Sequence, residues 1–460
     1  MSSQIEVLNP ATGLAIGTVD NASIADCLHA VDMAHDAFVP WKNTAPRVRA
    51  EILRKAFDIM IAEQEELART ITLEMGKVLS DARAEVAYAA EFFRWFSEEA
   101  VRIDGDYRRA PSGSNWLLVS CQPVGVALLA TPWNFPAAMA TRKIGPALAA
   151  GCTVVLKPAH DTPLTALAIA DILRRAGVPH GVVNVVVADP PGPAVEAMLN
   201  SGKVRKLSFT GSTRVGSLLL AQAAQHVINC SMELGGNAPL IVCADADIDV
   251  AVDGAMLAKM RNGGAACTAA NRFYVHDQVL SEFTDKFTAR MAALQLGDGL
   301  DPSTTLGPLV SRAQQQRVAD AVAGAVSRGA KVLCGGSAST EPAFGYQATV
   351  LAEVSPHDEI LQDEIFGPVA ALVSYSDEQE MLSLANNVEH GLVGYVFTRD
   401  AARGMRIAEA LETGMVGFNR GLVSDPSAPF GGVKASGIGR EGGHDGLLAF
   451  LETKYVAGNW

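Results

Sequence analysis

The chain has 460 residues, of which 49% are hydrophobic and 19% are charged, and its formal net charge is −13. This length allows about three domains, and the hydrophobic content is typical of a globular enzyme with a large core, not of a disordered chain. The acidic balance, with basic residues scattered along the chain, disfavours nucleic acid and anionic membranes as partners.

The cysteines and the apolar stretches narrow the class further. Seven cysteines stand far apart without a CxxC pair, which favours neither a disulfide framework nor a metal site. The N-terminus lacks a charged segment followed by an apolar core, and the most apolar long region, 124–158, is interrupted by prolines, Arg142 and Lys143. We therefore expect a cytoplasmic protein without signal peptide or membrane span.

The first hundred residues predict a β-hairpin and then helices. Residues 9–13, Asn-Pro-Ala-Thr-Gly, form a turn between expected strands at 5–8 and 16–18. Ser23 can cap the first of three amphipathic helices, Val48, Ile52 and Ile59 mark the second, and residues 77–103 the third. The alternating residues 116–122 follow a Pro-Ser-Gly-Ser turn, which predicts a strand in a hairpin.

From Gly125 the pattern changes to short buried strands alternating with helices. The strands are expected at 126–130, 153–157, 182–187 and 206–209, and such β-α units predict a parallel sheet of the dinucleotide-binding kind. Ligands bind beyond the carboxyl ends of such strands, where residues 131–136, 157–160 and 210–216 lie. The last segment opens a helix from a glycine-bounded loop, a weak but physical signal for phosphate binding.

Two residues further on are candidates for chemistry. Cys267 stands among small residues and follows two glycines, so little bulk blocks its sulfur; a thiolate there would be a nucleophile, although most cysteines are simple core residues. Glu233 is followed closely by two glycines and could be a general base, a helix cap or half of an ion pair.

The whole chain resembles the aldehyde dehydrogenase superfamily through a series of motifs in the family's order. They are Pro132-Trp-Asn-Phe135, Lys157-Pro158, Phe209-Thr-Gly-Ser212, Glu233-Leu-Gly-Gly236, Asn262-x-Gly-x-x-Cys267, Glu364-Ile-Phe-Gly-Pro368 and Pro429-Phe-Gly-Gly-x-Lys434. The resemblance implies an α/β fold with a Rossmann-type cofactor domain (1–104 and 124–233), an α/β catalytic domain (234–445) and a small β oligomerisation element (105–123 and 446–460). It also implies a homodimer or homotetramer.

The resemblance assigns the catalytic roles. Cys267 would attack the aldehyde carbon, the Asn134 amide and the Cys267 backbone N–H would hold the oxyanion, and Glu233 would activate water to release the acid. Relatives that transfer the acyl group to coenzyme A generally lack this glutamate, so we expect a free carboxylic acid as the product.

The cofactor residues follow from the same resemblance: Trp133, Lys157, His160, Gly211, Ser212, Glu364 and Phe366. His160 stands where NAD-preferring relatives carry a glutamate that repels a 2′-phosphate. Histidine removes this repulsion and can add a positive charge. We therefore expect NADP to be preferred over NAD.

Among its relatives the chain looks most like succinate-semialdehyde dehydrogenases, in which two arginines and a serine hold the substrate's distal carboxylate. Here these are Arg142, Arg261 and Ser424, and guanidinium groups suit that task; either arginine could instead make a structural salt bridge. The alternatives are a dehydrogenase for glutarate semialdehyde or for a broader range of aliphatic or aromatic aldehydes, and a non-catalytic nucleotide-binding relative.

Overall fold

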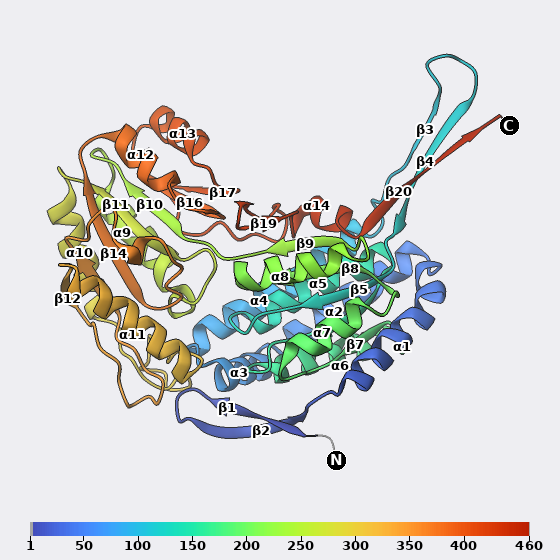
Figure 1. Cartoon of the computed structure of the whole chain (residues 1–460), viewed down its shortest axis with the longest axis horizontal. Coiled ribbons are helices and arrows are strands. Elements are labelled where there is room, and N and C mark those ends of the chain that lie inside the picture. Colours follow the sequence, from blue (N-terminus) through green and yellow to red (C-terminus); the bar gives the residue numbers. More distant parts are fainter. Residues whose placement is uncertain (1–2, 460) are drawn as a thin grey trace.

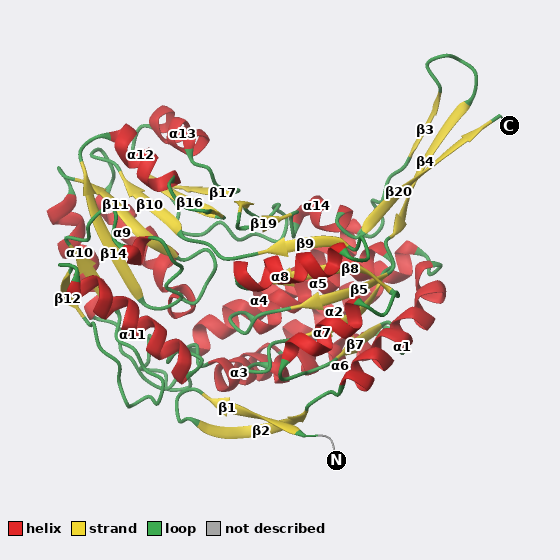
Figure 2. Ribbon diagram, in the orientation of Figure 1, coloured by secondary structure: helices red, strands yellow, loops and turns green. Residues whose placement is uncertain are grey.

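Two largely parallel sheets, each covered by helices, lie side by side, and a narrow three-stranded sheet projects from the body (Figures 1 and 2). The computed structural model describes residues 3–459. Among these residues, no helix is long and apolar enough to cross a membrane. The α/β fold class expected from the sequence is confirmed.

The N-terminal hairpin forms as expected, and the helices after it number four, where the sequence predicted three. Strands β1 (Gln4–Asn9) and β2 (Leu14–Asp20) pair antiparallel, and Ser23 caps α1 (Ile24–Lys42) in a capping box with Asp26. Then come α2 (Pro46–Ala62), α3 (Gln64–Met75) and α4 (Leu79–Glu99). Helix α3 was missed because only Glu63 separates it from α2, with no glycine or proline to mark the boundary.

The first sheet has six strands in the order β19-β9-β8-β5-β6-β7. Strands β5 (Val126–Ala130), β6 (Thr153–Lys157), β7 (Val183–Val185), β8 (Val204–Thr210) and β9 (Asn229–Glu233) run parallel, and β19 (Gly437–Ile438) joins β9 antiparallel. Helices α5 (Pro136–Ala150), α6 (Pro163–Ala176), α7 (Pro191–Leu199) and α8 (Thr213–Ala224) follow β5 to β8. The strand order reverses between β5 and β8, which makes their carboxyl ends the expected ligand site.

The second sheet has seven strands in the order β12-β13-β14-β11-β10-β16-β17. These are β10 (Ala238–Val242), β11 (Ala270–His276), β12 (Lys331–Cys334), β13 (Thr349–Ala352), β14 (Val369–Tyr375), β16 (Val393–Phe397) and β17 (Met415–Phe418). Its helices are α9 (Ile248–Met260), α10 (Leu280–Ala292), α11 (Arg312–Ser327), α12 (Glu378–Asn386) and α13 (Ala401–Ala410). Strand β15 (His390–Gly391) pairs with β18 (Val433–Lys434) outside both large sheets.

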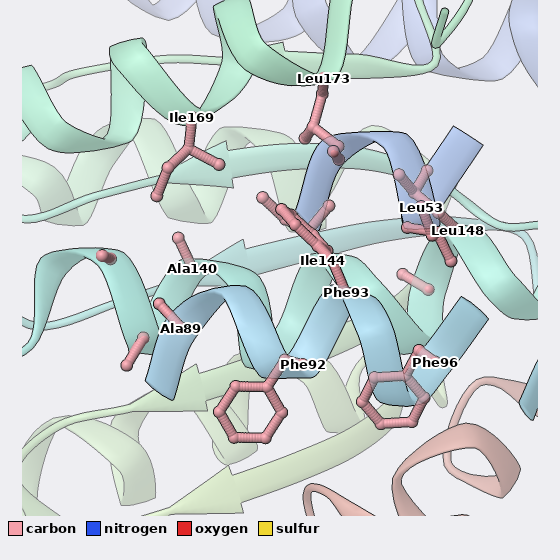
Figure 3. Packing of buried hydrophobic residues seen from close by; sticks show 14 of the residues in the cluster. Leu53, Ala89, Phe92, Phe93, Phe96, Ala140, Ile144, Leu148, Ile169 and Leu173 are labelled. Atoms are coloured by element: carbon pink, nitrogen blue, oxygen red, sulfur yellow. The ribbon is translucent and has the colours of Figure 1, made fainter. Parts of the chain in front are cut away.

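The largest apolar core fixes the position of α5 beneath the first sheet. Phe92, Phe93 and Phe96 of α4 pack in one buried cluster with Ile144 and Leu148 of α5 (Figure 3). Because α5 begins directly after the 131–135 segment, this packing holds one wall of the candidate site.

The projecting sheet has the order β20-β4-β3, with β3 (Asp106–Arg109), β4 (Trp116–Pro123) and β20 (Leu451–Gly458) all antiparallel. The predicted strand at 116–122 is therefore present. The tail that precedes β20 forms a short helix, α14 (Gly443–Leu448).

Candidate active site

The candidate site lies at the junction of the two large sheets. Strand β9 ends at Glu233 and β10 begins at Ala238, so the short segment 234–237 leads from the first sheet to the second. Cys267 lies just before β11, at the amino edge of the second sheet. A pocket at this junction is lined by several of the predicted site residues: Trp133, Asn134, Gly211, Ser212, Cys267, Glu364 and Phe366.

The backbone before Cys267 takes a tight left-handed path. Asn262, Gly263 and Gly264 have φ values of 58°, 60° and 80°, and Asp81 of α4 accepts the Asn262 N–H at 2.8 Å. A Cβ on Gly264 would lie 2.2 Å from the Gly367 carbonyl oxygen, so only glycine fits there. Ala266 is part of the α4–α5 apolar core, which explains why a small apolar residue stands next to the thiol.

Burial does not activate the Cys267 thiol. Removal from water raises its pKa to about 12, Arg142 lowers it, and Glu364 and Glu233 raise it further. The small surroundings therefore give access to the sulfur, while burial favours its protonated form.

Asn134 is held at the edge of the pocket by backbone and side-chain hydrogen bonds. Its side-chain N–H group donates to the Ala265 carbonyl at 3.1 Å, and the Asn262 amide donates to the same carbonyl at 2.8 Å. The Asn134 amide nitrogen carries a second hydrogen, which remains available to an oxygen beside Cys267.

Glu233 is a buried carboxyl group with a free oxygen. Its Oε2 atom has no hydrogen-bond partner within the described structure. Burial and then the carboxylate of Glu441 hold its pKa well above the ordinary 4.5, against Arg142, Lys143 and Arg440. A raised pKa suits a base that has to work near neutral pH.

The three residues predicted to bind a distal carboxylate come together around Tyr88 of α4. Arg261 Nη1 lies 3.4 Å from Ser424 Oγ, and the Tyr88 hydroxyl interacts with both Arg142 and Ser424. Burial raises the pKa of this hydroxyl, while the two arginines lower it. Two guanidinium groups and two hydroxyls therefore form one cluster, although none of these four residues lines the pocket at Cys267.

The salt-bridge alternative for Arg142 is also realised. Its Nε lies 2.6 Å from Glu441 Oε2, and its guanidinium stacks 4.3 Å from the centre of the Phe430 ring. Glu441 also pairs with Lys143. Arg142 thus touches the buried ion cluster through Nε and Tyr88 through the same guanidinium.

The nucleotide end of the site extends from the pocket along the first sheet. Ser212 caps α8 by accepting the Val215 N–H, and the Trp133 and Phe366 rings meet edge to face at 5.2 Å. Burial raises the pKa of Glu364 to about 8, and the hydrogen bond that its carboxyl group accepts from the Gly236 N–H is 3.5 Å long. Such an under-bonded carboxyl group fits ribose hydroxyls.

The two residues predicted to bind the adenosine side are Lys157, at the end of β6, and His160. Burial lowers the pKa of Lys157 to about 8, while Asp161 and Asp189 act against this shift. His160 Nε2 lies 3.8 Å from Asp161 Oδ2. Lys157 and His160 do not line the pocket around Cys267.

Comparison with known proteins decides the family, because the aldehyde dehydrogenase family model matches residues 1–456. The chain belongs to the aldehyde dehydrogenase family. A succinate-semialdehyde dehydrogenase from Paenarthrobacter nicotinovorans is 52% identical over 96% of this enzyme and 98% of the relative. A glutarate-semialdehyde dehydrogenase from Pseudomonas aeruginosa is 47% identical over 98% of this enzyme and 93% of the relative.

Solved structures agree with this assignment and confirm the expected fold. An NADP-dependent E. coli enzyme superposes with a TM-score of 0.98 at 46% identity, covering 100% of this chain and 95% of that one. An NAD+ complex of a Bacillus cereus aldehyde dehydrogenase gives 0.97 at 35% identity, covering 99% and 93%. The cofactor of this aldehyde dehydrogenase is therefore NADP or NAD, as expected.

Sequence reasoning missed several residues of this aldehyde dehydrogenase that touch the site. They are Tyr88 beside the arginines, Glu441 and Lys143 beside Glu233, and Gln314 and Arg317 in the pocket wall. Lys143 directly follows Arg142, so its charge next to a predicted substrate residue was an available signal, whereas Glu441 lies beyond the last motif, which ends at Lys434. Tyr88 sits in an ordinary amphipathic helix and gave none.

Proposed function

We propose that the enzyme oxidises succinate semialdehyde to succinate with NADP. The convergence of Arg142, Arg261, Ser424 and Tyr88 carries this proposal, because a short substrate with a terminal carboxylate would find two guanidinium groups there. Both arginines also act electrostatically on Cys267, so their charges are close enough to influence the thiol. The names of the two curated relatives support a semialdehyde that ends in a carboxylate.

Cys267 is the proposed nucleophile. The thiol, whose pKa is about 12, gives its proton to a base as sulfur attacks the aldehyde carbon, and Glu233 with its free oxygen can accept it. The resulting thiohemiacetal oxyanion takes a hydrogen bond from the Asn134 amide. Losing one such donor typically costs about 10²–10³ in rate.

Bound NADP or NAD supplies the hydride acceptor. Loss of hydride from the thiohemiacetal carbon leaves a thioester on Cys267. Glu233 gives up to solvent the proton that it took from the thiol and, as a carboxylate again, removes a proton from the water that attacks the thioester. Sulfur is a good leaving group, so the acid is released and the thiol is restored.

The preference for NADP rests on His160 and Lys157. Neither residue repels a 2′-phosphate, and both can donate hydrogen bonds to it. Asp161 lies close by and opposes a phosphate, but a protonated His160 pairs with it and offsets its charge. The NADP-dependent E. coli relative supports the same choice.

We also propose a homodimer or homotetramer assembled through the β3-β4-β20 arm, with 1–104 and 124–233 as the cofactor domain and 234–445 as the catalytic domain. The arm stands clear of the body (Figure 2), and its exposed apolar side chains support a role in assembly.

The decisive experiment measures kcat/KM for succinate semialdehyde, glutarate semialdehyde and butanal with NADP and with NAD, in the wild type and in Arg261→Met. We expect succinate semialdehyde with NADP to give the highest value. The variant should lose about 100-fold on both semialdehydes and less than about 3-fold on butanal, since a charge-assisted contact is worth about 1.5–3 kcal/mol. A higher value for glutarate semialdehyde selects the longer substrate, equal losses on butanal reject the anion site, and a higher value with NAD rejects the cofactor preference.

A further inference from the structure

We infer that Lys77 and Glu85, a buried ion pair, are positioning residues that hold Asn134 where its amide can meet the oxyanion. This inference rests on the role proposed above for Asn134. Lys77 Nζ and Glu85 Oε2 lie 2.5 Å apart, and their side chains are 1% and 0% exposed. Neither residue touches Cys267 or belongs to a motif of the sequence.

The direct contacts of the Lys77 ammonium group are with Glu85 and with the Asn134 segment. Besides Glu85, it donates to the Asn134 backbone carbonyl at 2.7 Å and lies 4.2 Å above the centre of the Phe135 ring. The Asn134 carbonyl receives a second hydrogen bond, at 2.9 Å, from the Asn262 side chain. The carbonyl of Asn134 is thus held by Lys77, just before α4, and by Asn262, in the segment before Cys267.

Glu85 fixes the helix that begins next to this peptide. Its Oε1 accepts the N–H groups of Ala137 at 2.8 Å and Ala138 at 3.3 Å, in the first turn of α5. Helix α5 has Phe135 at its N-cap position and no side-chain cap of its own. A carboxylate at a helix N-terminus is stabilised by the unpaired N–H groups and by the helix dipole, so Glu85 replaces the missing cap from another helix.

The main chain of Lys77 is anchored to the other half of the molecule. The next helix begins with Leu79 N–H donating to the Gly299 carbonyl at 2.9 Å, and a Cβ on Gly299 would lie 2.4 Å from the Lys77 carbonyl oxygen. Lys77 therefore connects the 299 loop to Asn134, whose side chain faces the pocket.

Stability alone does not explain the pair. Taking two charges out of water costs about as much as their attraction returns, and apolar replacements of buried ion pairs are often neutral or stabilising. What a Met–Gln pair could not supply is a donor to the Asn134 carbonyl. The geometry therefore points to orientation of the oxyanion amide as the purpose of Lys77.

The test is a double-mutant cycle on the single-turnover rate of NADPH formation. Lys77→Met should slow this rate about 10–100-fold with butanal and with succinate semialdehyde alike, and Asn134→Ala about 10²–10³-fold. If Lys77 acts through Asn134, the variant carrying both changes should be no slower than Asn134→Ala alone. An Asn134→Ala enzyme with the wild-type rate would instead refute the proposed oxyanion role itself.

Two further variants separate positioning from folding. Lys77→Met with Glu85→Gln removes both buried charges, so its Tm should recover toward the wild type while the rate stays low. Arg49→Met removes another buried cation, which donates at 3.1 Å to the Ala149 carbonyl at the far end of α5, and its effect should multiply with that of Asn134→Ala. Multiplicative losses for Lys77→Met and Asn134→Ala, or recovery of the rate together with the Tm, would overturn the inference.

Discussion

At Cys267, access to the sulfur and the protonation state of the thiol have to be considered separately. Its position in a small-residue loop gives access to the sulfur, yet burial and two nearby carboxyl groups keep the pKa at about 12. Arg142, which lowers that pKa, is also the arginine proposed to bind the substrate's carboxylate. The thiol, the anion site and Glu233 therefore form one electrostatic system, in which a charge added at one point is felt at the others.

Replacing Glu441 with Gln should move the titration of Glu233. After burial, the Glu441 carboxylate is the largest cause of the raised pKa of Glu233, while Arg142, Lys143 and Arg440 lower it. Removing the Glu441 charge leaves these cations unopposed, so the pKa of Glu233 should fall. Because the carboxylate is the active base, the acid limb of the kcat–pH profile should shift to lower pH, by roughly one unit.

The control for this shift is Glu99→Gln, which removes another buried carboxyl group, paired with His444 at 2.6 Å. That variant should leave the acid limb of the profile in place. An unchanged or upward-shifted limb in Glu441→Gln would show that Glu441 does not govern the protonation of Glu233.

Site residues that belong to a short sequence motif could be predicted, whereas those that stand alone in an ordinary helix or loop could not. Cys267, Asn134 and Glu364 stand in short motifs, and the structure places all three around one pocket. Tyr88, from α4, lies beside Arg142 and Ser424, and Glu441, from the loop before α14, pairs with Arg142 and Lys143. Their residue types are ordinary in those settings, so only the packing of distant segments shows what they touch.

At the scale of elements, two helices of the first sheet are capped by carboxylates from other helices. Glu85 of α4 caps α5, and Glu74 of α3 caps α6 through the N–H groups of Leu164 at 2.7 Å and Thr165 at 3.0 Å. Both capped helices begin with proline and lack a cap of their own. The prolines mark these helix starts in the sequence, but the capping partners, tens of residues away, could not be predicted from it.

Glu74 should make stability depend on pH. Burial raises its pKa to about 7 in the folded protein, against an ordinary 4.5. Because the pKa of Glu74 is higher in the folded protein, its protonation adds to the free energy of unfolding. This contribution is fully present below about pH 4.5 and is lost as the pH rises through about 7. Glu74→Gln removes this dependence, so its Tm relative to the wild type should increase between pH 5.5 and 8.5, corresponding to roughly 1–3 kcal/mol.

Glu66→Gln, an exposed change on the same helix, is the matched control and should show a Tm difference that does not vary with pH. A pH-independent difference for Glu74→Gln as well would mean that Glu74 is not protonated on folding. Thermal unfolding of the three proteins in a buffer series measures this directly.

At the scale of the whole molecule, the candidate site lies where the carboxyl end of β9 in the first sheet leads to the amino end of β10 in the second. Alternating strands and helices from Gly125 onward predicted the first sheet and the loops at its carboxyl edge, where Asn134 and Ser212 lie. The sequence could not show that β19, from the C-terminal region, adds a strand beside Glu233. A two-residue strand carries no periodic pattern, and its pairing depends on long-range closure of the chain.

The projecting arm carries exposed apolar side chains that packing within one chain does not explain. Tyr107, Leu118 and Val456 occupy one row across β3, β4 and β20, so their side chains share a face. They are 54%, 38% and 39% exposed, and the ring of Tyr107 stacks on that of Trp116 at 5.1 Å. An apolar row on a narrow sheet that stands away from the body (Figure 1) is the surface we expect a second copy of the chain to cover.

Leu118→Glu combined with Val456→Lys tests this expectation. The two residues are cross-strand partners, so the opposite charges can pair within the arm while the apolar surface is removed. Sedimentation velocity should show a smaller assembly, with the secondary structure and cofactor binding of each subunit retained. Leu14→Glu changes a side chain that is 68% exposed on the N-terminal hairpin and should leave the sedimentation coefficient unchanged. An assembly of wild-type size in the arm variant would exclude this face from the interface.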